Sequence, residues 1–256
     1  MTQTLDFSDL LRLIDDRSAV FRAAVAAAPD LDVQVPTCPD WTLRELAAHL
    51  GEGRRAWAAT VAAGPDATAK SAPRDASRAP RETDALLAWL AASTQELLDE
   101  LRAAGPERGC WTWWGTSQTP RTVGAVARHQ LHEVAIHTYD AQSAVGAPLP
   151  LPDEVAFDAI EEFLNTCCTT TTAWPHKPAT LDSRTAEGPS WRQRLDADGV
   201  SVTRLPASGA EPADAGVQAP AADLALVLYG RRPLDSVHLE GDRDLIDLVW
   251  EWDPNE

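Results

Sequence analysis

Glu133 and His137 lie four residues apart in the stretch 121–146, RTVGAVARHQLHEVAIHTYDAQSAVG. Apolar residues recur there at three- and four-residue steps, which predicts one amphipathic helix with Glu133 and His137 on its buried side. Residues i and i+4 on a helix are about 6 Å apart, so a carboxylate and an imidazole at this spacing can hold one ion between them. The pair is therefore half of a metal site, unless Glu133 simply pairs with His137 or with Arg128.

Two other histidines on the same predicted helix have to be weighed. His129 also lies four residues from Glu133, but a straight helix rises about 12 Å over eight residues, so His129 and His137 cannot both share one ion with Glu133. His132 points about 100° away from Glu133, towards another face. The spacing alone leaves open which histidine is used.

A third possible ligand comes from the segment 38–57, CPDWTLRELAAHLGEGRRAW. Its Thr42-x-x-Glu45 pattern is typical of a capping box at the start of a helix. His49 falls at the edge of the apolar side of that helix, where an imidazole can be a hydrogen-bonded core residue. Alternatively, it completes a set of two histidines and one carboxylate, which suits a catalytic zinc with an open position or non-haem iron.

Cysteines and tryptophans add further candidates around this set. Cys38 and Cys110 could approach a metal, or be small buried hydrophobic residues, and all four cysteines are expected to be free thiols. Three tryptophans, Trp111, Trp113 and Trp114, lie on the connector before the stretch 121–146. They are expected to pack on the end of the helices, with a role as a pocket wall as the alternative.

The fold expected from these patterns is α+β. Residues 1–150 should form a helical bundle, with helices predicted over 5–28, about 41–63, 82–104 and 121–146 and a long exposed loop over 64–80. After the proline-rich segment around 150 the pattern changes, so 151–256 should form a small α/β domain. Its predicted elements are a helix over 153–170, strands over 179–182, 190–195, 200–205 and 236–240, a turn at Asp198-Gly199, and helices over 220–229 and 242–250.

Composition excludes several classes of partner. With 22 basic and 39 acidic residues the formal charge is −17, which repels phosphate backbones and anionic lipid, so neither nucleic acid nor a membrane is expected as a partner. No stretch reaches 18 apolar residues, and the N-terminal residues lack the order of a secretory signal. We expect a cytoplasmic protein, a monomer or small homo-oligomer.

The two chemistry-bearing segments together resemble a known family. The pairing of CP-x-W-[ST]-x-R-x-L-x-x-HL with RHQLHEVAIHTYDA-x-x-A-x-G is similar to the mycothiol-dependent maleylpyruvate isomerase family, whose N-terminal half is a DinB-like four-helix bundle. The tail 224–247, LALVLYGRRPLDSVHLEGDRDLID, resembles the small C-terminal α/β domain of that family. Asp40 and His129 depart from the residues common in the family, and both could alter the pocket.

This resemblance implies a ligand set and an activity. The metal would be held by His49, Glu133 and His137, which selects His137 over His129. A divalent ion, expected to be Zn²⁺, would bind mycothiol as the thiol cosubstrate, because a coordinated thiol is held as a thiolate. The expected function is a metal-dependent, mycothiol-using isomerase or S-transferase acting on a small electrophile. Arg231 in YGRRPLD is a candidate for holding a substrate carboxylate, ahead of the neighbouring Arg232.

Other functions fit the same residues. A non-catalytic metal-binding or ligand-sensing protein would have the same bundle, and a purely structural metal would recruit a fourth ligand such as Cys38 or His129. A non-haem iron enzyme is a third possibility. The sequence does not specify the electrophile.

Overall fold

The structure is a computed structural model that describes residues 5–72, 78–208 and 210–253, and it divides into two units. The helical unit comprises Leu5–Trp113 and Arg121–Leu151, and the sheet unit comprises Trp114–Pro120 and the chain from Pro152 onward. The division after Leu151 falls beside the boundary expected at residue 150, whereas the short excursion at Trp114–Pro120 has no counterpart in the expectation. No helix in the described ranges is long and apolar enough to cross a membrane.

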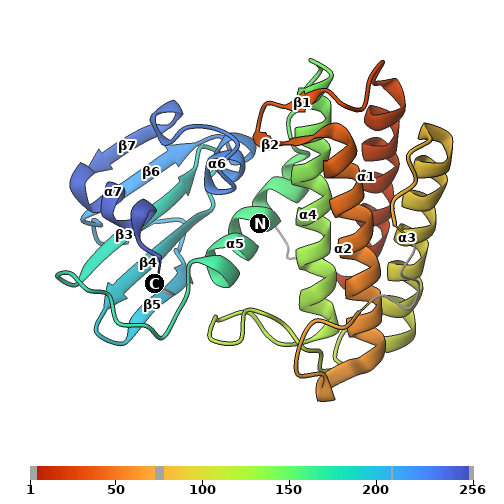
Figure 1. Cartoon of the computed structure of the whole chain (residues 1–256). Coiled ribbons are helices and arrows are strands. Elements are labelled where there is room, and N and C mark those ends of the chain that lie inside the picture. The colour runs from red at the N-terminus through yellow and green to blue at the C-terminus, as the bar shows by residue number, and fades with distance from the viewer. Residues whose placement is uncertain (1–4, 73–77, 209, 254–256) are drawn as a thin grey trace. The chain divides into compact units, whose positions relative to one another are not determined.

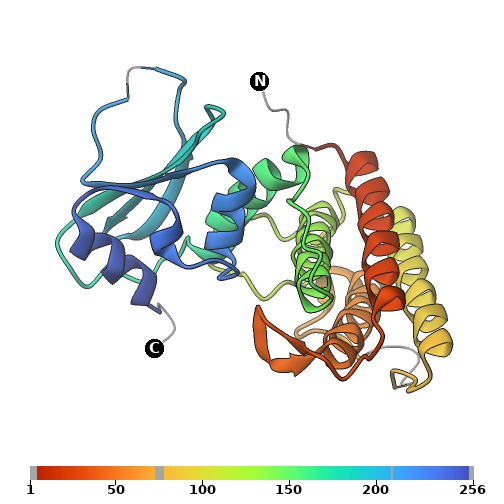
Figure 2. The same cartoon turned by 90° about the horizontal axis from the view of Figure 1, so that it is seen from above.

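Four long helices form the helical unit, labelled α1 to α4 in Figure 1 and viewed from above in Figure 2. Helix α1 packs against α4 and α2 against α3, with further contacts between α1 and α3 and between α2 and α4. The expected four-helix bundle is confirmed, and each helix end lies within two residues of its predicted position. The helices are α1 (Phe7–Ala27), α2 (Leu43–Ala63), α3 (Thr83–Ala104) and α4 (Val123–Ala144), with a short 3₁₀ turn η1 (Gly64–Asp66) after α2.

The start of α2 is fixed by the capping box expected from the sequence. The backbone N–H of Glu45 donates to Thr42 Oγ1 at 3.3 Å, and the backbone N–H of Thr42 donates to Glu45 Oε2 at 2.8 Å. The connector before it forms a small antiparallel hairpin of β1 (Gln34–Val35) and β2 (Cys38–Thr42). The hairpin runs directly into α2, and it also packs beside α4 through β1.

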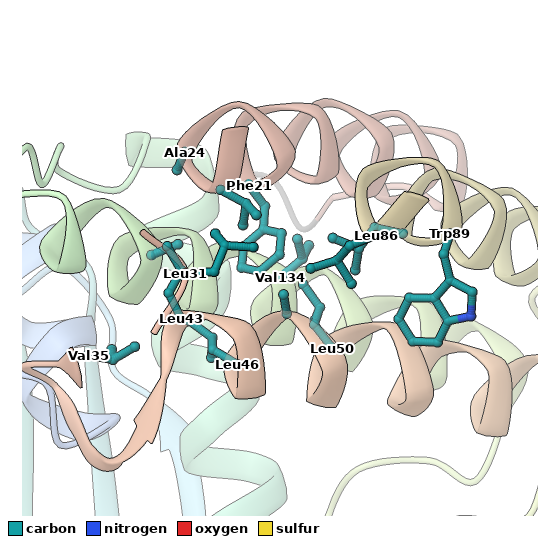
Figure 3. Packing of buried hydrophobic residues seen from close by; sticks show 14 residues of the cluster. Phe21, Ala24, Leu31, Val35, Leu43, Leu46, Leu50, Leu86, Trp89 and Val134 are labelled. Carbon is teal, nitrogen blue, oxygen red and sulfur yellow. The ribbon is translucent and has the colours of Figure 1, made fainter. Parts of the chain in front are cut away.

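Leucine side chains from α2 and α3 dominate the core near this hairpin, together with Phe21 of α1 and Val134 of α4 (Figure 3). Gly51 lets α2 approach Trp89 closely, because a Cβ atom placed on Gly51 would lie 2.0 Å from the indole ring. Gly53, two residues further along α2, has no heavy atom within 4 Å of the same position. Helix α2 therefore packs tightly against α3 at Gly51, whereas a side chain at Gly53 would meet no neighbouring atom.

The sheet unit has five strands in the order β5-β4-β3-β6-β7, with β3 and β6 parallel and the other neighbours antiparallel. Helix α5 packs against α6 and β5. The short strand β6 is missing from the sequence expectation, and the helix expected to reach residue 170 ends at Cys167, because Thr170 pairs through its backbone with Val200. The elements are α5 (Asp153–Cys167), β3 (Ala179–Thr185), β4 (Ser190–Asp196), β5 (Gly199–Arg204), β6 (Ala215–Ala219), α6 (Ala221–Leu228), η2 (Leu234–Ser236), β7 (His238–Gly241) and α7 (Arg243–Glu251).

The close contact at Gly51 gives a test of bundle packing. Replacing Gly51 with Ala should lower the free energy of unfolding by about 1–3 kcal/mol, because a methyl group there overpacks the interface with Trp89. Gly53→Ala is the matched control on the same helix, and it should leave stability unchanged or raise it by up to about 1 kcal/mol through helix propensity. Urea unfolding followed by circular dichroism measures both, and equal effects for the two variants would contradict the packing argument.

Candidate metal centre

Side chains from two helices of the bundle meet at one point. His49 comes from α2, and Glu133 and His137 come from α4. Glu133 Oε1 lies 3.1 Å from His49 Nε2 and 3.5 Å from His137 Nε2. One potential ligand atom from each of the three residues lies within 4.8 Å of the other two. The structure therefore brings together the three residues that the resemblance singled out.

Local sequence determines why these side chains converge. The capping box sets the start of α2, and the buried Leu46 and Leu50 then turn its apolar side to the core, leaving His49 at the edge of that side. On α4, Val134 and Ala141 are fully buried in the same core. The side of α4 that carries Glu133 is thereby held next to α2.

Asp140, a residue not predicted to belong to the site, binds the ring nitrogen of His137 that points away from Glu133. The Nδ1–H of His137 donates to Asp140 Oδ2 at 2.9 Å, so Nε2 is the nitrogen that faces Glu133. The carboxylate of Asp140 is fully buried and accepts hydrogen bonds from Thr37 Oγ1 at 2.7 Å and Cys38 Sγ at 3.5 Å. A carboxylate behind a ligating histidine orients the ring and raises its basicity. The spacing His137-x-x-Asp140 on one helix was a signal that could have found it.

The charges of this cluster reinforce one another. Burial acts to raise the pKa of Glu133, but hydrogen bonds with His137 and His49 outweigh it and hold that pKa well below its ordinary value. Burial acts to lower the pKa of His137, but the hydrogen bonds to Asp140 and Glu133 raise it to about 8. Without a metal, the neutral-pH centre is thus an ionised carboxylate beside a protonated imidazole. A divalent ion would take the place of that proton, so ion binding should release it.

His129 and His132 lie apart from this cluster of ligands. The ring of His129 sits 6.1 Å from that of Trp57 and 5.8 Å from that of Trp113. His132 is completely buried. Neither residue belongs to a group of potential ligands within the described part of the chain. The aromatic neighbour of His49 is Trp41, whose ring centroid lies 4.6 Å from that of His49.

A pocket of about 200 Å³ opens beside His49 and Glu133. Trp113, expected to pack on the helix ends, instead lines this pocket and is 51% exposed, while Trp114 is buried with its Nε1–H directed to the carbonyl of Pro120. Trp113 therefore has the alternative role of a pocket wall, whereas the buried Trp114 belongs to the sheet unit. The pocket is lined by His49, Leu50, Gly53, Arg54, Trp57, Lys70, Trp113, His129, Gln130 and Glu133.

Two cysteines considered as ligands have different surroundings. Cys38 belongs to a second cluster with His137 and Asp140 whose potential ligand atoms lie within 4.8 Å of one another, and its sulfur is directed at Asp140. Cys110 is buried, its Sγ lies 3.9 Å from the carbonyl oxygen of Thr60, and burial raises the pKa of its thiol. Cys110 therefore behaves as a small core residue.

Arg231 lies in the sheet unit, just after α6. Its Nη1–H donates to the backbone carbonyl of Tyr229 at 2.6 Å. All the distances that define the candidate metal centre lie within the helical unit. A role for Arg231 in binding a substrate carboxylate is taken up below as a proposal.

Both halves of the chain are similar to known proteins. Residues 11–142 match the model for the mycothiol maleylpyruvate isomerase N-terminal domain, and residues 154–248 match the C-terminal domain of the same enzyme family. Among solved structures, the mycothiol-dependent maleylpyruvate isomerase matches with a TM-score of 0.58 and 18% identity, and a histidine-to-alanine mutant of that enzyme matches with 0.59 and 16%.

Each of these matches covers 92% of this chain and 93% of the other, which shows a common fold. A comparison with curated protein sequences gave no match. The two domain models nevertheless account for most of the 256 residues. The chain therefore belongs to the mycothiol-dependent maleylpyruvate isomerase family of enzymes.

Proposed function

We propose that this protein is a metal-dependent enzyme that uses mycothiol to isomerise a small unsaturated substrate or to transfer the thiol to it. The observation that carries the proposal is the convergence of His49, Glu133 and His137, with Asp140 orienting His137. Two imidazole nitrogens and a carboxylate oxygen are the donors that a catalytic zinc site takes from a protein, with a position left for water or substrate. The residues present therefore fit a divalent ion.

The three ligand residues would prepare the thiol for addition to the substrate. His49, Glu133 and His137 would hold the ion, and a divalent ion there would keep a thiol sulfur in its thiolate form at neutral pH. The thiolate sulfur adds to one carbon of an activated double bond, and the electron pair of that bond moves onto the neighbouring electron-withdrawing group. The remaining single bond can rotate, and expulsion of the sulfur then restores the double bond in the trans form.

Two features of the chain bear on how a substrate would bind. The pocket of about 200 Å³ beside His49 and Glu133 is large enough for a small electrophile, and its walls include Trp57 and Trp113. Arg231 remains our candidate in the sheet unit for holding a carboxylate, since a guanidinium matches carboxylate geometry. If the electrophile does not eliminate the thiol, the carbanion formed by the same addition takes up a proton from water, and the product is a stable thioether, which is S-transfer.

Metal uptake tests the ligand set. The purified protein should contain about one divalent ion per chain, with zinc expected from the two histidines and one carboxylate. His137→Ala should abolish tight binding, because it removes a ligand, while His129→Ala should retain it. Elemental analysis and zinc titration measure both, and the reverse pattern would show that α4 uses its other histidine.

The role of Asp140 can be tested separately. Asp140→Asn keeps the shape of the side chain but removes the negative charge that supports His137, so zinc affinity should fall about 10–100-fold. Competition with a chromogenic chelator measures the affinity. Asp16→Asn, on the exposed surface of α1, is the control and should bind zinc as the wild type does. Unchanged affinity in Asp140→Asn would remove Asp140 from the site.

A thiol titration of the cobalt-substituted protein tests the chemistry itself. Mycothiol should change the visible spectrum towards that of a sulfur-ligated tetrahedral ion and should release a proton, because a three-ligand site has room for one external sulfur. Glutathione should be much weaker, because it lacks the sugar portions of mycothiol. If mycothiol, bacillithiol, glutathione and cysteine all leave the spectrum unchanged, the proposed thiol chemistry is wrong.

A further inference from the structure

Positive charge gathers at the pocket of a strongly acidic protein. The chain carries a formal charge of −17, yet Lys70 and Arg54 both line the cavity beside Glu133. Only one acidic side chain, Glu133, is among the described residues that line it. Such a local excess of cationic groups attracts anions against the overall charge of the molecule.

Lys70 is the cation that is open to a ligand. Its ammonium lies 5.2 Å from the ring centroid of Trp57, and no hydrogen bond or ion pair joins it to another residue that the structure describes. Burial lowers the pKa of Lys70, and the negative charge of Glu133 opposes this effect. A lysine placed over an indole face keeps its charge and can still direct its N–H groups at an oxygen anion.

Arg54 adds a positive charge to the pocket wall, and its two side-chain hydrogen bonds do not neutralise that charge. Its Nη1–H and Nη2–H donate to Thr94 Oγ1 at 2.6 Å and Ser18 Oγ at 2.7 Å, and both acceptors are uncharged. Burial, followed by repulsion from Arg22, lowers the pKa of Arg54 to about 9, so the guanidinium stays protonated at neutral pH. Since Glu133 would be committed to a metal ion, the remaining balance of charge in the pocket is positive.

The walls of the pocket fit a flat group. Trp57 and Trp113 both line it, and the ring centroid of His129 lies 6.1 Å from that of Trp57 and 5.8 Å from that of Trp113. Trp113 is 51% exposed, which is unusual for so large an apolar side chain. Aromatic faces at the edge of a pocket bind planar, unsaturated ligands by stacking.

We propose that Lys70 is a specificity residue that pairs with a carboxylate of the electrophilic substrate, while the exposed ring of Trp113 contacts the planar unsaturated part. This inference rests on the proposed function, which makes the ligand of this pocket the electrophilic substrate. A free carboxylate on the substrate would then strengthen binding through Lys70. Neutral esters of the same acids should still contact Trp113 but lose the ion pair with Lys70.

The two lysines of the chain, Lys70 and Lys177, allow a direct binding test. Reductive methylation with ¹³C-formaldehyde labels both amines and the N-terminus while keeping their charge. In the zinc-loaded full-length protein, maleate should shift the Lys70 signal much more than dimethyl maleate does. The exposed Lys177, in the sheet unit, is the internal control and should stay unshifted. A Lys70 signal that maleate leaves unmoved, or that the neutral ester moves equally, overturns the proposal.

Substitutions test whether the contact contributes to affinity. Lys70→Gln should weaken maleate binding about tenfold in calorimetric titrations, as expected for the loss of a charge-assisted hydrogen bond, and Lys70→Arg should restore most of it. Lys177→Gln should bind maleate as the wild type does. Any carboxylate that binds the zinc directly does so in all variants, so the differences report on Lys70, and equal affinity in Lys70→Gln and wild type overturns the assignment.

These experiments separate the inference from the proposed function. Maleate binding requires no thiol, so it can succeed even if mycothiol leaves the cobalt spectrum unchanged. In that case the pocket binds unsaturated acids without thiol chemistry. If instead mycothiol binds the metal but Lys70→Gln has no effect on maleate, the thiol chemistry stands and the specificity residue lies elsewhere.

Discussion

The partly buried carboxylate of Glu133 is the constraint on which the centre of the helical bundle depends. A carboxylate withdrawn from water is unfavourable unless cations or hydrogen-bond donors surround it. His49 from α2 and His137 from its own helix supply donors at 3.1 and 3.5 Å. Arg54 and Lys70 line the adjoining pocket, and both are attracted to the negative charge of Glu133. One negative charge therefore draws together residues from α2, α4 and the loop after α2.

The residues around Glu133 form two groups. One group fixes the two histidine side chains, and the other is exposed at the pocket. Asp140, fully buried and bonded to Thr37, fixes one imidazole, and the leucines beside His49 fix the helix that carries the other. By contrast, Trp113 and Lys70 are exposed at the pocket. If His49, Glu133 and His137 hold an ion as proposed, they can stay rigid, while the loop and connector that carry Lys70 and Trp113 would be free to vary the choice of electrophile.

Features set by nearby residues could be predicted from the sequence. The four long helices follow from periodic apolar residues, and the start of α2 follows from Thr42 and Glu45, because both signals act within a few residues. The i, i+4 spacing placed Glu133 and His137 together, but only the family resemblance selected His137 over His129. Short strands such as β1 and β6 carry too few residues for a periodic pattern, so they escaped prediction.

Contacts between distant segments could not be read in the same way. Thr37 and Asp140 meet only in the folded bundle, and Lys70 comes from a stretch whose composition predicts an exposed loop. The different environments of Trp113 and Trp114, adjacent in the chain, likewise depend on tertiary structure. Comparison with the solved structures also shows that a fold can persist while most residues differ, because identities of 16–18% accompany a fold shared over 92% of the chain. Packed cores tolerate many exchanges that keep volume and pattern.

The hydrogen bonds from the hairpin to Asp140 also have a consequence for the order of folding. They join residues 102 and 103 positions apart, across a segment that contains all of α2 and α3. Closing so long a loop costs conformational entropy that only later contacts repay, so such pairings tend to form late. The helices can therefore begin to assemble before the orienting carboxylate receives its partners. The ion-binding geometry would be completed in one of the last steps of folding, when the hairpin docks on α4.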